Sequence, residues 1–243
     1  MSVNKLLIGV ALLALIGVGG AYLWSMNGSA GQPSAGQPSA GQPSATQQAD
    51  SGAEATIDLA KPIDDPLAKV QEGDILLGDP DAPVTMIEYF SYSCGHCANF
   101  HAQTFPELKK TYIDTGKVKL VMRDFPLNRP ALEAALMIHC LSPMAYWGMT
   151  EHLFKTQEQW VVEQSLPPLG AIAKTAGLDD AAFQACVGDT AKRDGVIAGA
   201  EAGTKAFGID STPTFVIDGI VVKGDRSFAT FQKILDGQLA VPH

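Results

Sequence analysis

The chain has 243 residues, of which 46% are hydrophobic and 18% are charged, and its formal net charge is −9. This much apolar material is sufficient for one sizeable core, so the chain is not disordered throughout. The acidic balance argues against a role in binding nucleic acid, because phosphate backbones are bound by clustered basic side chains.

The amino-terminal segment is typical of targeting and tethering rather than of a folded domain. Residues 6–24 are uncharged and mostly apolar, and a helix of that length is about 28 Å long, close to the ~30 Å hydrocarbon core of a bilayer. Lys5 is the only charged side chain beside them, which favours a cytoplasmic amino terminus and export of the rest. We therefore predict a signal anchor over residues 1–24 with a membrane span at 6–24. Cleavage after Ala30, which would release a soluble periplasmic form, is the alternative.

A repetitive segment follows the predicted anchor. Residues 31–45 are three copies of GQPSA, and such small and turn-forming residues cannot bury a core. Residues 25–65 are therefore predicted to be a flexible linker with an r.m.s. span of roughly 35 Å. Residues 66–243 are predicted to form the folded domain.

The folded domain begins with two predicted strands that enclose a helix. Residues 83–90, PVTMIEYF, form an apolar run bounded by turn residues, which predicts a buried strand. The segment CGHCANFHAQTFPELKKTY predicts a helix from the cysteines onward, kinked or divided at Pro106. Residues 116–127 predict the second strand.

The rest of the chain predicts a helical region and then a hairpin. An alanine-rich stretch from about 130 to 207 predicts several helices. Residues 212–224 predict two short strands joined by a turn at Asp218 and Gly219, a dipeptide typical of hairpins. Ser227 is a candidate N-cap for a closing helix.

Cys94 and Cys97 are spaced as i and i+3 at the predicted start of a helix. Unpaired N–H groups and the positive end of the helix dipole favour a thiolate at the first of them. A thiolate is the attacking species in disulfide exchange, so Cys94 is the candidate nucleophile and Cys97 the candidate resolving thiol. Zinc is one alternative, but a structural zinc site needs four ligands, and we predict no metal and no cofactor. A purely structural Cys94–Cys97 disulfide is another, disfavoured because so small a loop removes little unfolded-chain entropy.

Glu88 interrupts an apolar strand six residues before the first cysteine. A carboxylate there can lie beneath a disulfide, where burial would raise its pKa and make it a proton donor or acceptor for Cys97. A solvated glutamate on an exposed strand face is the alternative.

His96 lies between the two cysteines, where an imidazole can stabilise the Cys94 thiolate and make the disulfide more oxidising. An exposed histidine without influence on the thiol is the alternative. His101 and His139 are interpreted as a helix-surface residue and a packing residue, respectively.

The ordered set of motifs resembles the DsbA-like thiol:disulfide oxidoreductases of the thioredoxin superfamily. The matching pieces are APVTMIEYFSYSCGHC, VMRDFPL, the helical region and STPTFVIDG, which span roughly residues 75–238. The resemblance implies an α/β thioredoxin fold with a helical insertion at about 128–207. It also implies that Pro213 is cis and packs against the cysteines. The Thr212 backbone could then pair with an extended substrate segment, and its hydroxyl could form a hydrogen bond near the Cys94 sulfur.

Two positions depart from the best-known members of that group. Gly95 occupies a place that is often proline, and Thr212 precedes Pro213 where those members have valine. Both departures leave open the balance between oxidase and isomerase activity.

Cys140 and Cys186 both lie in the predicted helical region. A disulfide between them would suit an oxidising compartment and would contribute roughly 4 kcal/mol in the chain-entropy model. Two buried free thiols are the alternative.

The sequence therefore predicts an anchored enzyme on the periplasmic side of the bacterial inner membrane that introduces disulfides into reduced or unfolded exported proteins. By the resemblance, a membrane quinone-linked partner reoxidises it. Two alternatives stay open: a disulfide isomerase or reductase of the same compartment, and a non-catalytic peptide-binding surface module.

Overall fold

The computed structural model describes residues 61–242. The predicted signal anchor, its membrane span and the GQPSA repeats lie outside these residues. Within residues 61–242, no helix combines the length and the apolar character needed to cross a bilayer. The end of the predicted linker already contacts the domain, since the Ile63 N–H donates to the Gly219 carbonyl at 2.9 Å.

Five strands form one mixed sheet in the order β1-β3-β2-β4-β5. Strands β2 and β3 are parallel, and the other neighbouring pairs are antiparallel. Every residue of the central strand β2 is buried. The strands are β1 Leu76–Leu77, β2 Val84–Phe90, β3 Val118–Asp124, β4 Thr214–Ile217 and β5 Ile220–Lys223.

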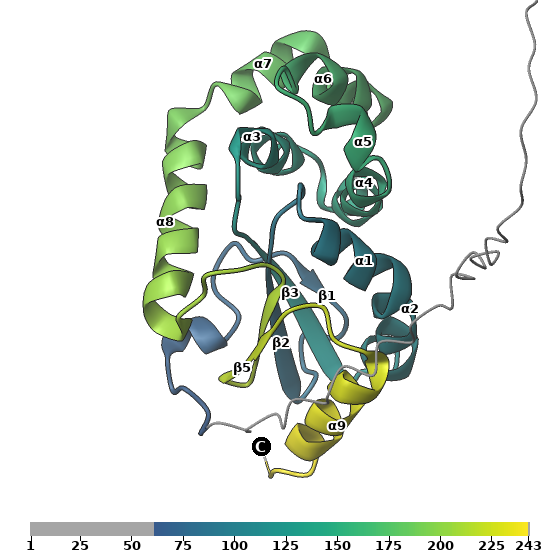
Figure 1. The fold of residues 1–243 in the computed structure, drawn as a ribbon, viewed down its shortest axis with the longest axis vertical. Helices are drawn as coiled ribbons and strands as arrows, with labels where there is room; N and C mark the ends of the chain where they lie inside the picture. The colour runs from purple at the N-terminus through teal and green to yellow at the C-terminus, as the bar shows by residue number, and fades with distance from the viewer. Residues whose placement is uncertain (1–60, 243) are drawn as a thin grey trace, which may run out of the picture. The chain divides into compact units, whose positions relative to one another are not determined.

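The helices surround this sheet in three groups (Figure 1). One group follows β2, a larger group lies between β3 and β4 in the chain, and a last helix follows β5. The first group is α1 Gly95–Gln103, α2 Phe105–Leu108 and the π-helical turn η2 Lys109–Ile113. The second is α3 Arg129–Ile138, α4 Pro143–Lys155, α5 Gln157–Trp160, α6 Leu166–Thr175, α7 Asp180–Val187 and α8 Thr190–Phe207, and the last helix is α9 Phe228–Leu239.

The two faces of the sheet pack against different helices, because alternate residues of a strand point to opposite faces. Met86 and Phe90 of β2 belong to the larger core cluster, which includes residues of α1, α2, α9 and helices α3 to α7. Ile87 and Tyr89 belong to a smaller cluster with Phe207 at the end of α8. In Figure 1, α3 to α7 gather beyond one end of the sheet, whereas α8 returns along it.

Helix α8 approaches the sheet closely at one glycine. A Cβ added to Gly203 would lie 2.5 Å from the Tyr89 ring. Only a residue without a side chain permits this approach, so Gly203 fixes how the helical region meets the sheet.

The helix predicted from the cysteines is divided near Pro106. Helix α1 ends at Gln103 and α2 begins at Phe105, with Pro106 in its first turn. Proline is tolerated there because the first N–H groups of a helix have no intrahelical partner.

The predicted hairpin and its closing helix are confirmed. Asp218 and Gly219 have φ values of 44° and 87°, the left-handed conformation of a two-residue hairpin turn. The Ser227 side chain accepts a hydrogen bond from the Thr230 N–H and so caps α9. Strand β1 is absent from the sequence prediction because two residues carry no periodic signal.

Candidate active site

Hydrogen bonds from the loop after β2 and from the helical region hold the beginning of α1 in place. Cys94 is the N-cap residue of α1, with extended backbone angles of −81° and 119°, and its N–H donates to the Ser91 carbonyl. Gln157, from α5 in the helical region, donates through Nε2 to the carbonyls of Tyr92 at 2.7 Å and Cys94 at 3.0 Å. The helical region therefore fixes the loop that carries the first cysteine. Sequence reasoning missed Gln157, because nothing in its local pattern indicates this long-range contact.

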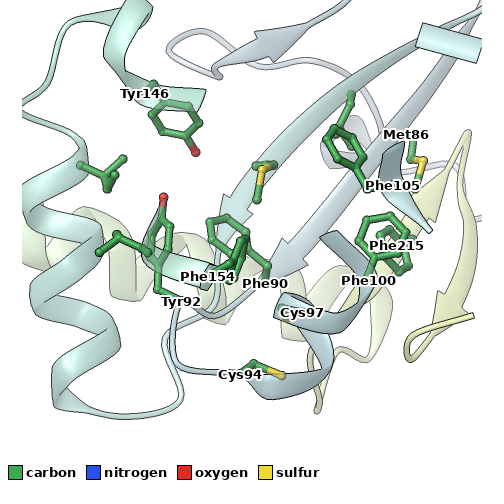
Figure 2. Close-up of a cluster of buried hydrophobic side chains, with 14 of the residues drawn as sticks. Met86, Phe90, Tyr92, Cys94, Cys97, Phe100, Phe105, Tyr146, Phe154 and Phe215 are labelled. Carbon is green, nitrogen blue, oxygen red and sulfur yellow. The ribbon is translucent and has the colours of Figure 1, made fainter. Parts of the chain in front are cut away.

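The two cysteines of this motif are free thiols that differ in exposure. Cys94 is 8% exposed and Cys97 is fully buried. Figure 2 shows Cys94 at the end of the loop that enters α1, and Cys97 within the buried cluster that includes Phe90 and Phe154. Of the two sulfurs, that of Cys94 is thus the one that an incoming thiolate can reach.

The surroundings of the two thiols shift their pKa values in opposite directions. The hydrogen bond from the Cys97 thiol is the largest influence on Cys94 and lowers its pKa to about 5, against the opposing effect of burial. The backbone N–H groups of Cys97 and His96 act in the same direction. Burial raises the pKa of Cys97 far above its ordinary value. At neutral pH the reduced pair therefore consists of a Cys94 thiolate and a Cys97 thiol.

The Thr212–Pro213 peptide bond is cis, as the family resemblance predicts. In the thiol form, the Cys94 sulfur donates a hydrogen bond to the Thr212 carbonyl at 3.3 Å. The Thr212 side chain also helps to lower the pKa of Cys94, although its buried Oγ1 lies outside regular hydrogen-bonding geometry with any atom of residues 61–242. The loop before β4 thus lies directly against the reactive sulfur.

Glu88 is fully buried on β2, so the alternative of a solvated glutamate is wrong. Its Oε2 lies 2.9 Å from Nε2 of His101. Its charge is one of the influences that raise the pKa of Cys97, after burial and the hydrogen bond with Cys94. Glu88 therefore interacts electrostatically with the buried thiol.

The prediction that His101 lies on the helix surface is wrong, because its side chain is only 4% exposed. It follows Cys97 by four residues, so both face the same side of α1. That spacing is the sequence signal that could have identified His101. The helix turns this face toward β2, where Glu88 is the buried partner of the imidazole.

His96 and His139 are both exposed. Among residues 61–242, the His96 imidazole makes no hydrogen bond, and this residue reaches Cys94 through its backbone N–H. His139 caps α3 and lies 2.6 Å from Oδ2 of Asp124, so it is an ion-pair residue rather than a packing residue. That hydrogen bond raises the pKa of His139.

Gly95 is exposed, and a Cβ added to it would meet no atom within 4 Å. Glycine is thus not required there by packing, and its influence on the thiols must come through the backbone of the first helical turn.

Cys140 and Cys186 form a disulfide with an S–S distance of 2.02 Å. It joins the residues that follow α3 to helix α7, within the helical region. Lys192 of α8 places its Nζ 3.2 Å from the Cys140 sulfur.

Comparison with known proteins points to the same group as the motifs. A family model described as Thioredoxin matches residues 70–237. A protein of Rickettsia bellii named "Putative protein-disulfide oxidoreductase" is 32% identical over 154 residues, which are 63% of this chain and 60% of the relative. The "Disulfide bond formation protein D" of Bacillus subtilis is 27% identical over 186 residues, which are 69% of this chain and 78% of that protein.

Among solved structures, Wolbachia pipientis alpha-DsbA1 matches with a TM-score of 0.67 and 32% sequence identity, over 71% of this chain and 94% of that one. The comparisons confirm the predicted thioredoxin fold with additional helices. The chain spans about three fifths of the length of the Rickettsia relative.

Proposed function

The chain belongs to the DsbA-like group of the thioredoxin family, and on this premise we propose that it is an exported oxidoreductase that introduces disulfides into other proteins. The observation that carries this proposal is the asymmetry of the cysteine pair: Cys94 has a pKa of about 5 and lies beside a buried thiol. A first cysteine of low pKa stabilises the reduced form, which makes the disulfide oxidising.

The reaction begins with a substrate thiolate that attacks the Cys94 sulfur of the oxidised pair. The Cys94–Cys97 bond breaks, and Cys97 leaves with the electron pair and takes up a proton, because its buried position disfavours the thiolate. A second substrate thiolate then attacks the substrate sulfur bonded to Cys94. Cys94 leaves as a thiolate, which its low pKa favours. The substrate has lost two electrons and the enzyme pair has gained them.

The residues around the pair have supporting roles in this proposal. Glu88 holds or supplies the proton of the buried thiol. Thr212, next to Pro213 and with its carbonyl 3.3 Å from the Cys94 sulfur, pairs through its backbone with an extended substrate segment. Gly95 and His96 form the first helical turn, whose N–H groups face the thiolate. Reduced or unfolded exported proteins are the substrates that such main-chain recognition suits.

Location and reoxidation complete the proposal. The 1–24 anchor, with its span at 6–24, holds the enzyme on the periplasmic side of the inner membrane, and the 25–65 linker lets the 66–243 domain reach its substrates. A membrane quinone-linked partner restores the disulfide. This part is supported by the apolar length at 6–24 and by the alternation of oxidised and reduced forms that the chemistry requires.

A peptide that contains two thiols tests the reaction directly. The oxidised full-length protein is expected to oxidise one equivalent of peptide, and Cys94→Ser should abolish this. Cys97→Ala cannot form the Cys94–Cys97 disulfide and should not oxidise the peptide either, but when it is given the disulfide form of the peptide its Cys94 should form a mixed disulfide that accumulates, because Cys97 is missing to resolve it. Cys94→Ser that still oxidises the peptide at the wild-type rate would refute the mechanism.

An isomerase or reductase is the second candidate, favoured by Gly95 and by Thr212 before Pro213. The equilibrium of the Cys94–Cys97 pair with glutathione, together with its redox state in intact cells, separates the candidates. A mostly oxidised pair indicates an oxidase, and a mostly reduced pair indicates an isomerase or reductase. A pair that does not exchange with glutathione would indicate a peptide-binding module.

A further inference from the structure

Beneath the reactive pair, β2 and α1 bring together three groups that can carry a proton. Cys97 and Glu88 are both fully buried, and His101 follows Cys97 by one turn of α1 with a side chain that is 4% exposed. The Glu88 Oε2 and the His101 Nε2 are 2.9 Å apart. Because the charge of Glu88 acts on Cys97, the three groups form a chain from the thiol to the imidazole.

This chain has an unused polar atom on each of its last two members. Oε1 of Glu88 and Nδ1 of His101 are buried and have no hydrogen-bond partner among the described residues. Buried polar atoms in native proteins are nearly always satisfied by protein or water. These two atoms of one carboxylate–imidazole pair are therefore available to other partners, such as a thiol proton and a water molecule.

The imidazole also forms part of the wall of a groove. His101 lines a cavity of about 720 Å³ between α1, α2 and α4, which has room for several water molecules at about 30 Å³ each. The Phe154 ring stacks on the imidazole, with ring centroids 4.6 Å apart, and so fixes its orientation. The charged residues that line the groove are Lys109 from η2 and Glu151 and Lys155 from α4.

The proposed reaction requires Cys97 to gain a proton in one half of the cycle and to lose it in the other. A Cys97 thiolate left unprotonated after substrate attack would attack Cys94 again and reverse the reaction. In the opposite half of the cycle, the Cys97 thiol must lose its proton before it can attack a mixed disulfide at Cys94. The Cys97 side chain is fully buried, so water cannot serve it directly.

We propose that His101 relays the proton of Cys97 between Glu88 and the water of the groove beside α1. This inference rests on the proposed disulfide exchange at Cys94 and Cys97. His101 acts through Glu88 and does not touch the reacting sulfurs, so it is a positioning and relay residue rather than a catalytic one.

The proton balance closes over one catalytic cycle. When Cys97 leaves as a thiolate, the imidazole passes its Nε2 proton to the Glu88 carboxylate, Glu88 passes a proton on to Cys97, and Nδ1 takes one proton from groove water. During reoxidation the Cys97 thiol returns its proton to Glu88, Glu88 passes one to Nε2, and Nδ1 releases one to water. The two halves move one proton each in opposite directions. The imidazole therefore returns to its starting tautomer without turning over.

Reoxidation by oxidised glutathione tests the relay on the reduced full-length protein. Cys94 first forms a mixed disulfide with glutathione, and the ring closes when Cys97 loses its proton and attacks. His101→Gln keeps an N–H donor toward Glu88 but cannot pass a proton on. We expect ring closure to slow by at least about 10-fold, because general acid–base catalysis typically contributes about 100-fold or more. Acid-quenched samples analysed by mass should then show accumulated mixed disulfide.

Chemical rescue separates a relay from a merely structural role. His101→Ala removes the imidazole and enlarges the groove at that point. Added imidazole should restore most of the lost rate, whereas pyrazole, which has the same size but is far less basic, should not. His139→Gln is the matched control, because His139 also pairs with a carboxylate, Asp124, but lies outside the thiol site. Its ring-closure rate should equal that of the wild type.

The outcomes separate the relay from the function on which it rests. A wild-type rate in His101→Gln, or equal rescue of His101→Ala by pyrazole and imidazole, would overturn the relay and leave the exchange reaction intact. Failure of the wild-type protein itself to react with oxidised glutathione would overturn the proposed exchange.

Discussion

The protein contains two pairs of cysteines in two different settings. Cys94 and Cys97 are three residues apart at the start of a helix, where one sulfur meets N–H groups and the other is buried. Cys140 and Cys186 are 46 residues apart and connect two segments of the helical region. The first pair encloses too short a loop to stabilise the chain much, and the second encloses a long one. The same side chain thus supplies chemistry in one region and stability in the other.

The two histidine–carboxylate pairs show a parallel difference. His101 and Glu88 have side chains that are 4% and 0% exposed, and each has one buried polar atom without a hydrogen-bond partner in the part of the chain that the structure describes. His139 and Asp124 have side chains that are 35% and 10% exposed, so water is available to the imidazole directly. Of these two pairs, only His101 and Glu88 lie beside a buried thiol that water cannot reach directly, so a proton relay is needed only there.

The largest expected effect is on activity. Replacing both Cys94 and Cys97 by alanine should reduce oxidation of a dithiol peptide to the rate without enzyme, because no exchangeable sulfur remains. At about pH 5, where most of the stabilising contribution of the Cys94 thiolate is lost, the free energy of unfolding should stay close to that of the reduced wild-type protein. Peptide oxidation and denaturant unfolding measured on the same preparation check both halves of this statement. Retained activity would show that the Cys140–Cys186 disulfide can exchange with the thiols of the peptide.

The second pair should give the reverse result. Replacing Cys140 and Cys186 by alanine removes a cross-link between residues 46 apart, and the chain-entropy model assigns about 4 kcal/mol to such a loop. We expect the free energy of unfolding to fall by about that amount, while peptide oxidation at low temperature is unchanged. A loss of activity in the folded variant would mean that the two regions are coupled.

The stability of the reduced protein should depend on pH through Cys94 alone of the four cysteines. Its folded pKa is about 5, below the value of about 8.5 of an unfolded thiol. The contribution is therefore fully present above the unfolded pKa and is lost as the pH falls through about 5. Cys97 stays protonated across this window because its pKa is raised.

Denaturant unfolding from about pH 8 to about pH 5 checks this sign. The reduced wild-type protein should lose stability relative to Cys94→Ser as the pH falls. The ultraviolet absorbance of the thiolate should disappear with a midpoint near the Cys94 pKa of about 5. An absorbance midpoint near that of an ordinary thiol would remove the main support for an oxidising pair.

The smallest expected effect concerns Lys192. Its Nζ lies 3.2 Å from the Cys140 sulfur, so the cation should assist Cys140 as a leaving thiolate when the disulfide is reduced. Because partly exposed charge interactions are weak, Lys192→Met should slow reduction of the Cys140–Cys186 bond by only about two-fold. The rate of reduction by dithiothreitol, followed by alkylation and mass analysis, measures this. A change of much larger size would mean that this pair, too, is activated by its surroundings.

Much of the site could be predicted because its signals are local. The i and i+3 spacing of Cys94 and Cys97, at the junction of an apolar strand and a helix, defines a redox motif by itself. The Asp218 and Gly219 turn and the break near Pro106 follow from backbone preferences that a few residues determine. Glu88 was a candidate because a charge in an apolar strand is unusual.

The residues that sequence reasoning misjudged depend on contacts between distant segments. Gln157 reaches the loop of Cys94 from 63 residues away. The four-residue spacing between His101 and Cys97 places both on one side of α1, but this side is buried only because α1 packs against β2.

The sequence by itself determined the chemistry that this protein carries, since two cysteines at a helix start and a carboxylate six residues earlier are properties of neighbouring residues. Only the tertiary structure decided how that chemistry is controlled. The pKa of a thiol depends on burial and on hydrogen bonds from its neighbours in space, and a proton needs a physical path to water. Both depend on how β2, α1 and α4 pack together, which no single segment of the chain encodes.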